Sequence, residues 1–221
     1  MSSLAAPVFA IPGLGTNARL FEPLAEHLPL RPLRWLSPAD AGESLRSYAA
    51  RMAIAIDHPQ PWLLGVSFGG VMAQEIARLR PVRGLILVSS LKPGDRRPAY
   101  LRWSRKVPLY RLTQGKWRIH TLPLYAPRFG VRKWSEIRLL KEMFSSFDDH
   151  YRMWAIRQLV HWEGQPLKHS YLHLHGSKDH VLPIRGLQQV TPIEGGSHLM
   201  VYQQPERIAQ EIESWVERKL L

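Results

Sequence analysis

Short apolar runs alternate with amphipathic stretches along most of this chain. A run of four or five apolar residues is typical of a strand that a sheet buries on both faces, whereas apolar residues at helical spacing indicate an amphipathic helix. The predicted strands cover residues 7–11, 33–36, 62–66, 84–88, 171–175 and 189–193. One predicted helix begins near Thr16 or Asn17, and the others cover residues 45–56, 68–79, 135–162 and 206–220.

The alternation of strand and helix favours a doubly wound α/β fold, in which a mainly parallel sheet of about six strands carries helices on both faces. The pattern breaks between about residues 91 and 168, where the chain is basic, rich in aromatic residues and clearly helical only toward the end. We therefore expect a single domain over residues 1–221, with a helical cap inserted at about 91–168 over the open end of the sheet.

The composition narrows the chemistry that the chain can perform. With 221 residues and 45% hydrophobic content the chain can bury a full core. Because it has no cysteine, it can form no disulfide, thiolate metal site or cysteine nucleophile, and covalent catalysis falls to a serine. The N-terminal residues lack the basic region of a secretory signal, and no apolar stretch is long enough to cross a bilayer, so we expect a cytoplasmic protein.

The net charge of +12 is concentrated in one segment. Residues 92–141 hold 14 of the 30 Lys and Arg but only Asp95 and Glu136 of the 18 acidic residues. Such a segment is most often a solvated face, but it could also receive an acidic carrier protein, a phosphorylated substrate or an anionic membrane surface. Nucleic acid is the less favoured partner, because no recognition motif accompanies the charge.

The most informative motif lies at residues 65–69, where Gly65-Val66-Ser67-Phe68-Gly69 follows an apolar run and precedes a helical pattern. The G-x-S-x-G pattern is typical of a nucleophilic serine at a tight strand-to-helix turn, where a Cβ on either side would collide with neighbouring backbone. Taken alone, the same residues could form an ordinary glycine-rich turn.

A serine hydroxyl needs a base within hydrogen-bond reach, and the base needs a carboxylate to orient it. In the topology of this turn they follow in the order Ser, then Asp or Glu, then His, on loops after later strands. Asp179 lies in the loop after the fifth predicted strand, and His198 lies in the loop after the sixth. Their alternative roles are a turn residue or helix cap for Asp179 and a cap of the final helix for His198.

Four segments together make the sequence resemble the α/β-hydrolase superfamily. They are Ile11-Pro12-Gly13-Leu14-Gly15, the turn at 65–69, His175-Gly176 through Asp179 to Pro183, and Gly195-Gly196-Ser197-His198. Two features depart from the family pattern. Pro12 stands where the first loop often has histidine, and the chain begins at the family's third strand, without the usual leading hairpin.

The resemblance implies that Ser67 is the nucleophile, His198 the general base and then acid, and Asp179 the residue that orients the imidazole. It also implies an oxyanion hole formed by the backbone N–H groups of Leu14 and Phe68. The family's strand order would be 2-1-3-4-5-6 here, which places the switch point between the first and third strands. Ligands bind at such switch points.

A metal site formed by His173, His175, Asp179 and His180 is the alternative that these residues leave open. The spacing does not fit the signature of metallo-hydrolases, since three residues separate His175 from Asp179. A dinuclear zinc site also needs further ligands downstream, where only His198 is clearly placed. We therefore expect neither a metal nor another cofactor.

The function that this pattern favours is a serine hydrolase that cleaves a carboxylic ester or thioester through an acyl-enzyme. The same scaffold also hosts lyases and peroxidases with a serine triad, so the fold does not decide the reaction. One alternative is an esterase or thioesterase whose acyl group arrives on an acidic carrier protein at the basic cap, as in the pimeloyl-carrier ester hydrolases that share this fold. Another is a binding protein that keeps the fold without catalysis.

Overall fold

A six-stranded parallel sheet forms the centre of the protein, in the order β2-β1-β3-β4-β5-β6. The computed structural model describes residues 6–107 and 117–220. The strands are β1 (Val8–Ile11), β2 (Leu30–Pro32), β3 (Trp62–Val66), β4 (Gly84–Val88), β5 (Tyr171–Gly176) and β6 (Thr191–Ile193). The doubly wound fold and the strand order expected from the sequence are thus confirmed.

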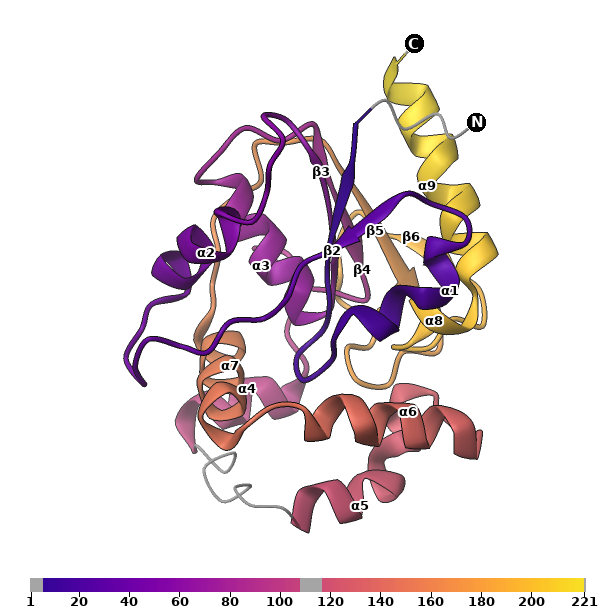
Figure 1. Ribbon diagram of the computed structural model, residues 1–221. Coiled ribbons are helices and arrows are strands. Elements are labelled where there is room, and N and C mark those ends of the chain that lie inside the picture. The colour runs from indigo at the N-terminus through magenta and orange to yellow at the C-terminus, as the bar shows by residue number, and fades with distance from the viewer. Residues whose placement is uncertain (1–5, 108–116, 221) are drawn as a thin grey trace.

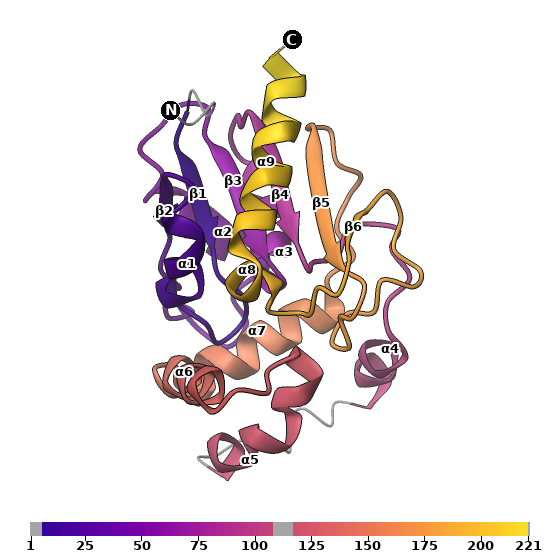
Figure 2. The same cartoon turned by 90° about the vertical axis from the view of Figure 1, so that its right-hand side faces the viewer.

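Helices cover both faces of this sheet (Figures 1 and 2). They are α1 (Glu22–Ala25), α2 (Leu45–Ala53), α3 (Phe68–Ala77), α4 (Ala99–Lys106), α5 (Trp117–Tyr125), α6 (Trp134–Ser145), α7 (Asp149–His161), α8 (Met200–Gln203) and α9 (Pro205–Leu220), with 3-10 turns η1 (Ala18–Phe21) and η3 (Ala126–Phe129). No helix in the described ranges is long and apolar enough to span a membrane.

Alternation along the strands divides the apolar core into two clusters. Val8 and Leu64 point to the face covered by α1, α8 and α9, whereas Phe9 and Leu63 point to the face covered by α2 and α3. Successive residues of a strand point to opposite faces, so a strand buried on both faces must be apolar throughout. All five residues of β3 and of β4 are buried, as the continuous apolar runs predicted.

The second predicted strand was wrong in position. β2 ends at Pro32, and Leu33 N–H makes one further bond to the Ala10 carbonyl oxygen at 2.8 Å. Beyond it, the Tyr48 hydroxyl both donates to the Leu36 carbonyl oxygen (2.6 Å) and accepts from the Leu36 N–H (2.8 Å). The apolar residues at 33–36 therefore pack against side chains of α2 instead of extending the sheet.

Two predicted helices also differ in detail. The first, expected near Thr16 or Asn17, is η1 followed by the single turn α1, and Asn17 caps it by accepting from the Arg19 N–H. The helix predicted over 135–162 is two helices, α6 and α7. Asp148 Oδ1 accepts from the Tyr151 N–H at 2.7 Å and so begins α7, as an aspartate at an N-cap does.

The chain between β4 and β5 forms helices α4 to α7, which lie beyond the carboxyl ends of the strands (Figures 1 and 2). Within it, α6 buries Leu140 and Met143 in the cluster of α9, whereas α7 buries Tyr151 and Trp154 in the cluster of α3. The α4–α7 segment, described over residues 99–107 and 117–161, therefore extends the cores on both faces of the sheet and covers the end where the β3–α3 turn lies.

Candidate active site

Ser67 lies at the turn between β3 and α3 with backbone angles φ 54° and ψ −118°. A residue with a Cβ avoids such a positive φ unless its surroundings hold it there. The Ser67 N–H donates to the Val88 carbonyl oxygen at 2.9 Å, and the Ser67 carbonyl oxygen accepts from the Gly70 N–H (3.0 Å) and Ser90 Oγ (2.7 Å). Three hydrogen bonds thus hold the strained backbone of Ser67.

The glycines on both sides of Ser67 allow this turn to approach its neighbours closely. A Cβ at Gly65 would overlap the carbonyl oxygen of Gly69, and a Cβ at Gly69 would overlap that of Ile11. Backbone therefore packs on backbone where β3 turns into α3 beside β1. The expected steric reason for the glycines of the G-x-S-x-G motif is present at both positions.

His198 lies between Ser67 and Asp179. Its Nε2 is 3.0 Å from Ser67 Oγ, and its Nδ1 is 2.7 Å from Asp179 Oδ2. In a neutral imidazole the nitrogen facing a carboxylate carries the proton, so Nε2 has the lone pair that can accept from the Ser67 hydroxyl. The structure thus brings together the three side chains predicted as the triad, from three separate loops.

Asp179 is buried and its carboxylate is fully engaged. Its Oδ1 accepts from the N–H groups of Val181 (2.9 Å) and Leu182 (2.8 Å), while Oδ2 faces His198. Burial by itself would raise the pKa of Asp179, but the electrostatic influence of His198 and hydrogen bonds from His175 and His198 outweigh it and hold that pKa below its ordinary value. Asp179 therefore stays ionised in the interior.

The two amides predicted as an oxyanion hole belong to Leu14, in the loop after β1, and to Phe68, the residue after Ser67. Gly13 is close to Ser67, and its carbonyl oxygen accepts from Thr16 N–H (3.1 Å), Thr16 Oγ1 (2.9 Å) and Trp35 Nε1 (3.2 Å). The oxygen and hydrogen of a trans peptide point in opposite directions, so these three bonds also set the direction of the Leu14 N–H.

Phe68 begins α3, where amide groups lack partners within the helix. The Trp35 ring stacks on the Phe68 ring with centroids 5.4 Å apart. In the described part of the chain, neither the Leu14 nor the Phe68 amide donates to another backbone group. Both are therefore available to a ligand oxygen.

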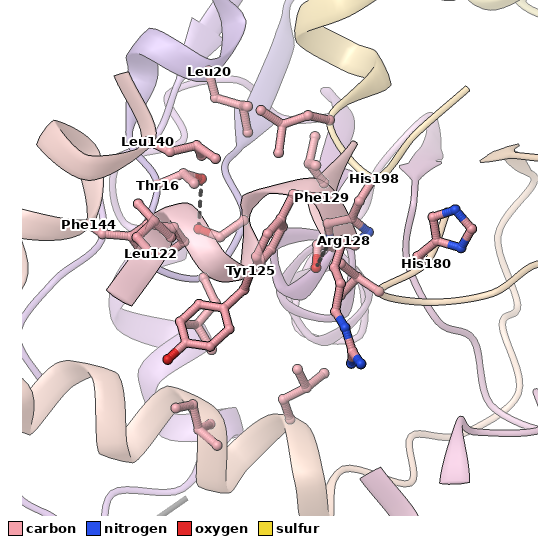
Figure 3. A pocket seen from close by; sticks show the side chains of 18 of the residues that line it. Thr16, Leu20, Leu122, Tyr125, Arg128, Phe129, Leu140, Phe144, His180 and His198 are labelled. Carbon is pink, nitrogen blue, oxygen red and sulfur yellow. Dashed lines mark hydrogen bonds between the residues drawn. The ribbon is translucent and has the colours of Figure 1, made fainter. Parts of the chain in front are cut away.

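A cavity of about 670 Å³ opens beside Ser67 and His198. Figure 3 shows Leu122, Leu140 and Phe144 at one end of it, and Arg128 and His180 on the side of His198. The individual residues that the α4–α7 segment contributes were not predicted. Its richness in aromatic residues was the one available signal, and it did not separate residues of the cavity from residues of the segment's own core.

Residues 4–211 match the sequence profile of the Alpha/beta hydrolase family. The chain belongs to this family. A search of curated proteins finds no match. Among solved structures, the chain is similar to a thermophilic esterase from Thermogutta terrifontis, with 21% identity, a TM-score of 0.74, and coverage of 98% of this chain and 91% of that one.

Two further solved structures share the fold. An esterase from Exiguobacterium antarcticum is 17% identical, with a TM-score of 0.68 and coverage of 98% and 93%. A bromoperoxidase from Bacillus anthracis is 13% identical, with a TM-score of 0.72 and coverage of 96% and 92%. At these identities the likeness concerns the fold alone.

Among the histidines considered as metal ligands in this α/β hydrolase, His180 differs from the other two in its surroundings. His173 and His175 are buried in β5, whereas the exposed His180 lines the cavity. Within the described ranges no group of three or more histidine and acidic side chains is placed to hold a metal ion. His173 instead faces Lys92, with 3.1 Å between Lys92 Nζ and His173 Nδ1.

The place of Lys92 in the basic segment had suggested a residue of a solvated face. The structure shows that it is buried instead. Only 7% of it is exposed, and burial lowers the pKa of its ammonium group while Asp95 opposes that effect. Burial also lowers the pKa of His173 from 6.5 to about 2, with the nearby charge of Lys92 as the second cause. His173 is thus a neutral imidazole in the folded protein.

Replacement of Gly65 by alanine should lower the free energy of unfolding by about 2 kcal/mol or more, because the added methyl group overlaps backbone that cannot move freely. Gly13→Ala is the matched control, since a Cβ there would have its nearest neighbour at 3.5 Å. Urea denaturation of both variants measures the difference. Equal losses in the two variants would contradict the steric account of the turn.

Acid should destabilise the fold partly through His173. The unfolded chain takes up a proton at His173 below about pH 6.5, but the folded protein does not do so until about pH 2, so acid favours unfolding in this window. Between pH 7 and pH 5 this one group should cost about 2 kcal/mol.

Urea denaturation at pH 7 and pH 5 tests this effect by comparing wild type with His173→Gln. The variant should lose less stability on acidification by about that amount. His150→Gln, which changes an exposed histidine of α7, is the control and should follow wild type. The same acid sensitivity in all three proteins would show that His173 is protonated in the folded state.

Proposed function

We propose that this protein is a serine hydrolase that cleaves a carboxylic ester or thioester through an acyl-enzyme. The observation that carries the proposal is the position of His198, which lies within 3.0 Å of Ser67 Oγ and 2.7 Å of the buried Asp179 carboxylate. This arrangement supplies a nucleophile, a base that can take its proton and a fixed anion that stabilises the resulting imidazolium.

In the proposed reaction, Ser67 Oγ attacks the acyl carbon while His198 Nε2 takes the hydroxyl proton. The oxyanion that forms accepts hydrogen bonds from the Leu14 and Phe68 N–H groups, and the positive end of the α3 dipole adds to them. His198 then gives its proton to the departing alkoxide or thiolate, which leaves the acyl group on Ser67. Water, deprotonated by His198, attacks the acyl carbon, and His198 then returns this proton to Ser67 Oγ as the carboxylic acid leaves.

The cavity supports an apolar acyl group as part of the substrate. Leu20, Leu122, Leu140 and Phe144 line it, and its volume of about 670 Å³ can hold a molecule much larger than acetate. In this proposal the α4–α7 segment is the predicted cap of a single domain, and its helices decide which acyl groups can reach Ser67.

The comparisons agree with an esterase but do not choose it over other reactions. Two of the similar structures are esterases, while a third, with the same fold, is a bromoperoxidase. Chemistry depends on the site and not on the fold. Turnover of p-nitrophenyl esters of increasing chain length is therefore the decisive measurement.

Ser67→Ala and His198→Ala should each reduce kcat/KM for such esters by about 10⁴-fold or more, because members of a triad act as a unit. Asp179→Asn should cost about 10⁴-fold while leaving the fold intact, since an amide can stabilise the wrong imidazole tautomer. Labelling by a fluorophosphonate, located by peptide mass spectrometry, should occur at Ser67 and disappear in Ser67→Ala.

Ser47→Ala, which changes an exposed serine of α2, is the control and should keep wild-type turnover and labelling. A label on another serine would refute the assignment of the nucleophile. Absence of both labelling and turnover in wild type would favour the non-catalytic binding protein.

A second candidate, supported by the surface of the α4–α7 segment, is delivery of the acyl group by an acidic carrier protein. On α4, the exposed Arg102 and Lys106 flank Trp103, which is 69% exposed. Arg105 pairs with Glu163 at 2.7 Å, and Arg111, which belongs to the same basic stretch, lies outside the described residues. Exposed cations beside an exposed aromatic ring suit an acidic protein with an apolar cargo.

In this case kcat/KM for an acyl-carrier-protein substrate should fall about tenfold as salt rises, whereas kcat/KM for a neutral ester should change less than about twofold, because salt screens the attraction. Changing Arg102 and Lys106 to Ser should produce the same selective loss. The control is Arg218→Ser with Lys219→Ser, in the last turn of α9 at the opposite end of the molecule (Figure 1). If salt changes kcat/KM equally for the two substrates, the basic residues form only a solvated face.

A further inference from the structure

A chain of buried polar side chains lies behind Asp179, on the side away from the cavity. It consists of Lys92, which follows β4, and His173 and His175, which alternate along β5 and so share one face. All three are buried, and His175 has no exposed surface. A buried ammonium group is rare unless it is paired, so the arrangement of its partners requires an explanation.

The hydrogen bonds of these buried side chains all run in one direction from donor to acceptor, and Lys92 sets that direction. An ammonium group can only donate, and Lys92 Nζ faces the Gln188 carbonyl oxygen, Asp95 Oδ1 at 3.6 Å and His173 Nδ1 at 3.1 Å. His173 Nδ1 must therefore be the accepting nitrogen. Because His173 is neutral, its one proton is on Nε2.

The proton on His173 Nε2 has two acceptors within reach. The Ser90 carbonyl oxygen is 3.2 Å from it, and His175 Nδ1 is 3.4 Å from it. Two N–H groups cannot point at each other, so His175 Nδ1 must also be unprotonated and its proton is on Nε2. The tautomer of the first imidazole thus decides the tautomer of the second.

The last proton of this series of hydrogen bonds is donated to the Leu182 carbonyl oxygen, and the carboxylate of the proposed triad lies beside it. His175 Nε2 is 2.7 Å from the Leu182 carbonyl oxygen and 3.4 Å from Asp179 Oδ2, which is the same oxygen that faces His198. The chain reaches Ser67 as well, because Ser90, whose carbonyl oxygen accepts from His173, donates its hydroxyl to the Ser67 carbonyl oxygen. Both the acid loop and the serine turn are therefore tied to it.

We infer that Lys92, His173 and His175 are positioning residues of the active site, which together hold the His175 Nε2–H between the Leu182 carbonyl oxygen and Asp179 Oδ2 and so keep that oxygen aimed at His198. The inference rests on the proposed function only for its catalytic consequence. The order of donors and acceptors stands on the geometry of the buried chain. None of the three residues touches the cavity, so each acts through Asp179 or the Ser67 backbone.

Nitrogen-15 NMR of histidine-labelled protein at pH 7.5 tests the order of donors directly. The tautomers are distinguished by correlations between the carbon-bound ring protons and the two ring nitrogens. Both His173 and His175 should be neutral, with the proton on Nε2. In Lys92→Met, whose unbranched side chain is one atom shorter and lacks the donor, the Nδ1–H form of His173 should become populated. A proton on Nδ1 of either ring in wild type would overturn the inference, whatever the enzyme does.

The catalytic consequence is tested by two variants of similar size. His175→Gln can still place an N–H donor between the Leu182 carbonyl oxygen and Asp179, whereas His175→Met cannot. We expect His175→Met to lower kcat about tenfold with KM within about twofold of wild type, and His175→Gln to retain kcat within about threefold. Turnover is expressed per site titrated by fluorophosphonate, so that an unfolded fraction does not count.

The pattern of results separates this inference from the proposed function. If Ser67→Ala keeps full turnover, the proposed function is wrong. The NMR measurement of the two tautomers then still tests the order of donors and acceptors independently. If Ser67→Ala is inactive but His175→Met and His175→Gln share the same kcat, His175 contributes only packing and the inference is wrong. If His175→Met does not fold, the comparison passes to Lys92→Met, whose loss of kcat should accompany the change of the His173 tautomer.

Discussion

The close approach of backbone to backbone at the β3–α3 turn is the constraint on which the candidate site depends. With glycine at positions 65 and 69, the turn fits against α3 and β1 with no side chain between them. That fit holds Ser67 at φ 54° and puts its hydroxyl in front of His198. It also brings the start of α3 beside the Gly13 loop, so the nucleophile and the two candidate oxyanion donors come from one junction.

The second requirement of the site is a buried anion that stays charged. Asp179 meets it because four groups donate to or attract its two oxygens, from two backbone amides, His198 and His175. The two amides are those of Val181 and Leu182 in the loop of Asp179 itself, whereas His175 lies on β5 and His198 follows β6. The buried charge therefore links loops that the sheet alone would leave independent.

Lys92 places a second buried charge in the same region. Its ammonium group has acceptors from Asp95, Gln188 and His173, so the cost of removing it from water is offset within a few ångströms. Removing one partner of such a buried charge strongly lowers the free energy of unfolding, whereas the paired arrangement favours a single set of rotamers and tautomers. In the serine hydrolase proposed here, which would have to hold its acid and base within tenths of an ångström, such uniqueness is useful beyond its effect on stability.

The sequence by itself determined the features that arise from short-range patterns. Continuous apolar runs predicted five of the strands closely, and the G-x-S-x-G turn identified Ser67, because a glycine requirement and a strand-to-helix boundary are local. The order of Ser67, Asp179 and His198 indicated three loops at one end of a parallel sheet, since the carboxyl ends of parallel strands meet there.

Tertiary structure alone decided which residues beyond these loops meet. The Tyr48 hydroxyl of α2 forms hydrogen bonds with the backbone of Leu36, beyond the end of β2. Lys92 contacts His173, which is 81 positions away in the sequence, so a residue that looked like surface charge is part of the interior. Such contacts depend on how distant segments pack together, and neither hydrophobic periodicity nor motif spacing carries that information.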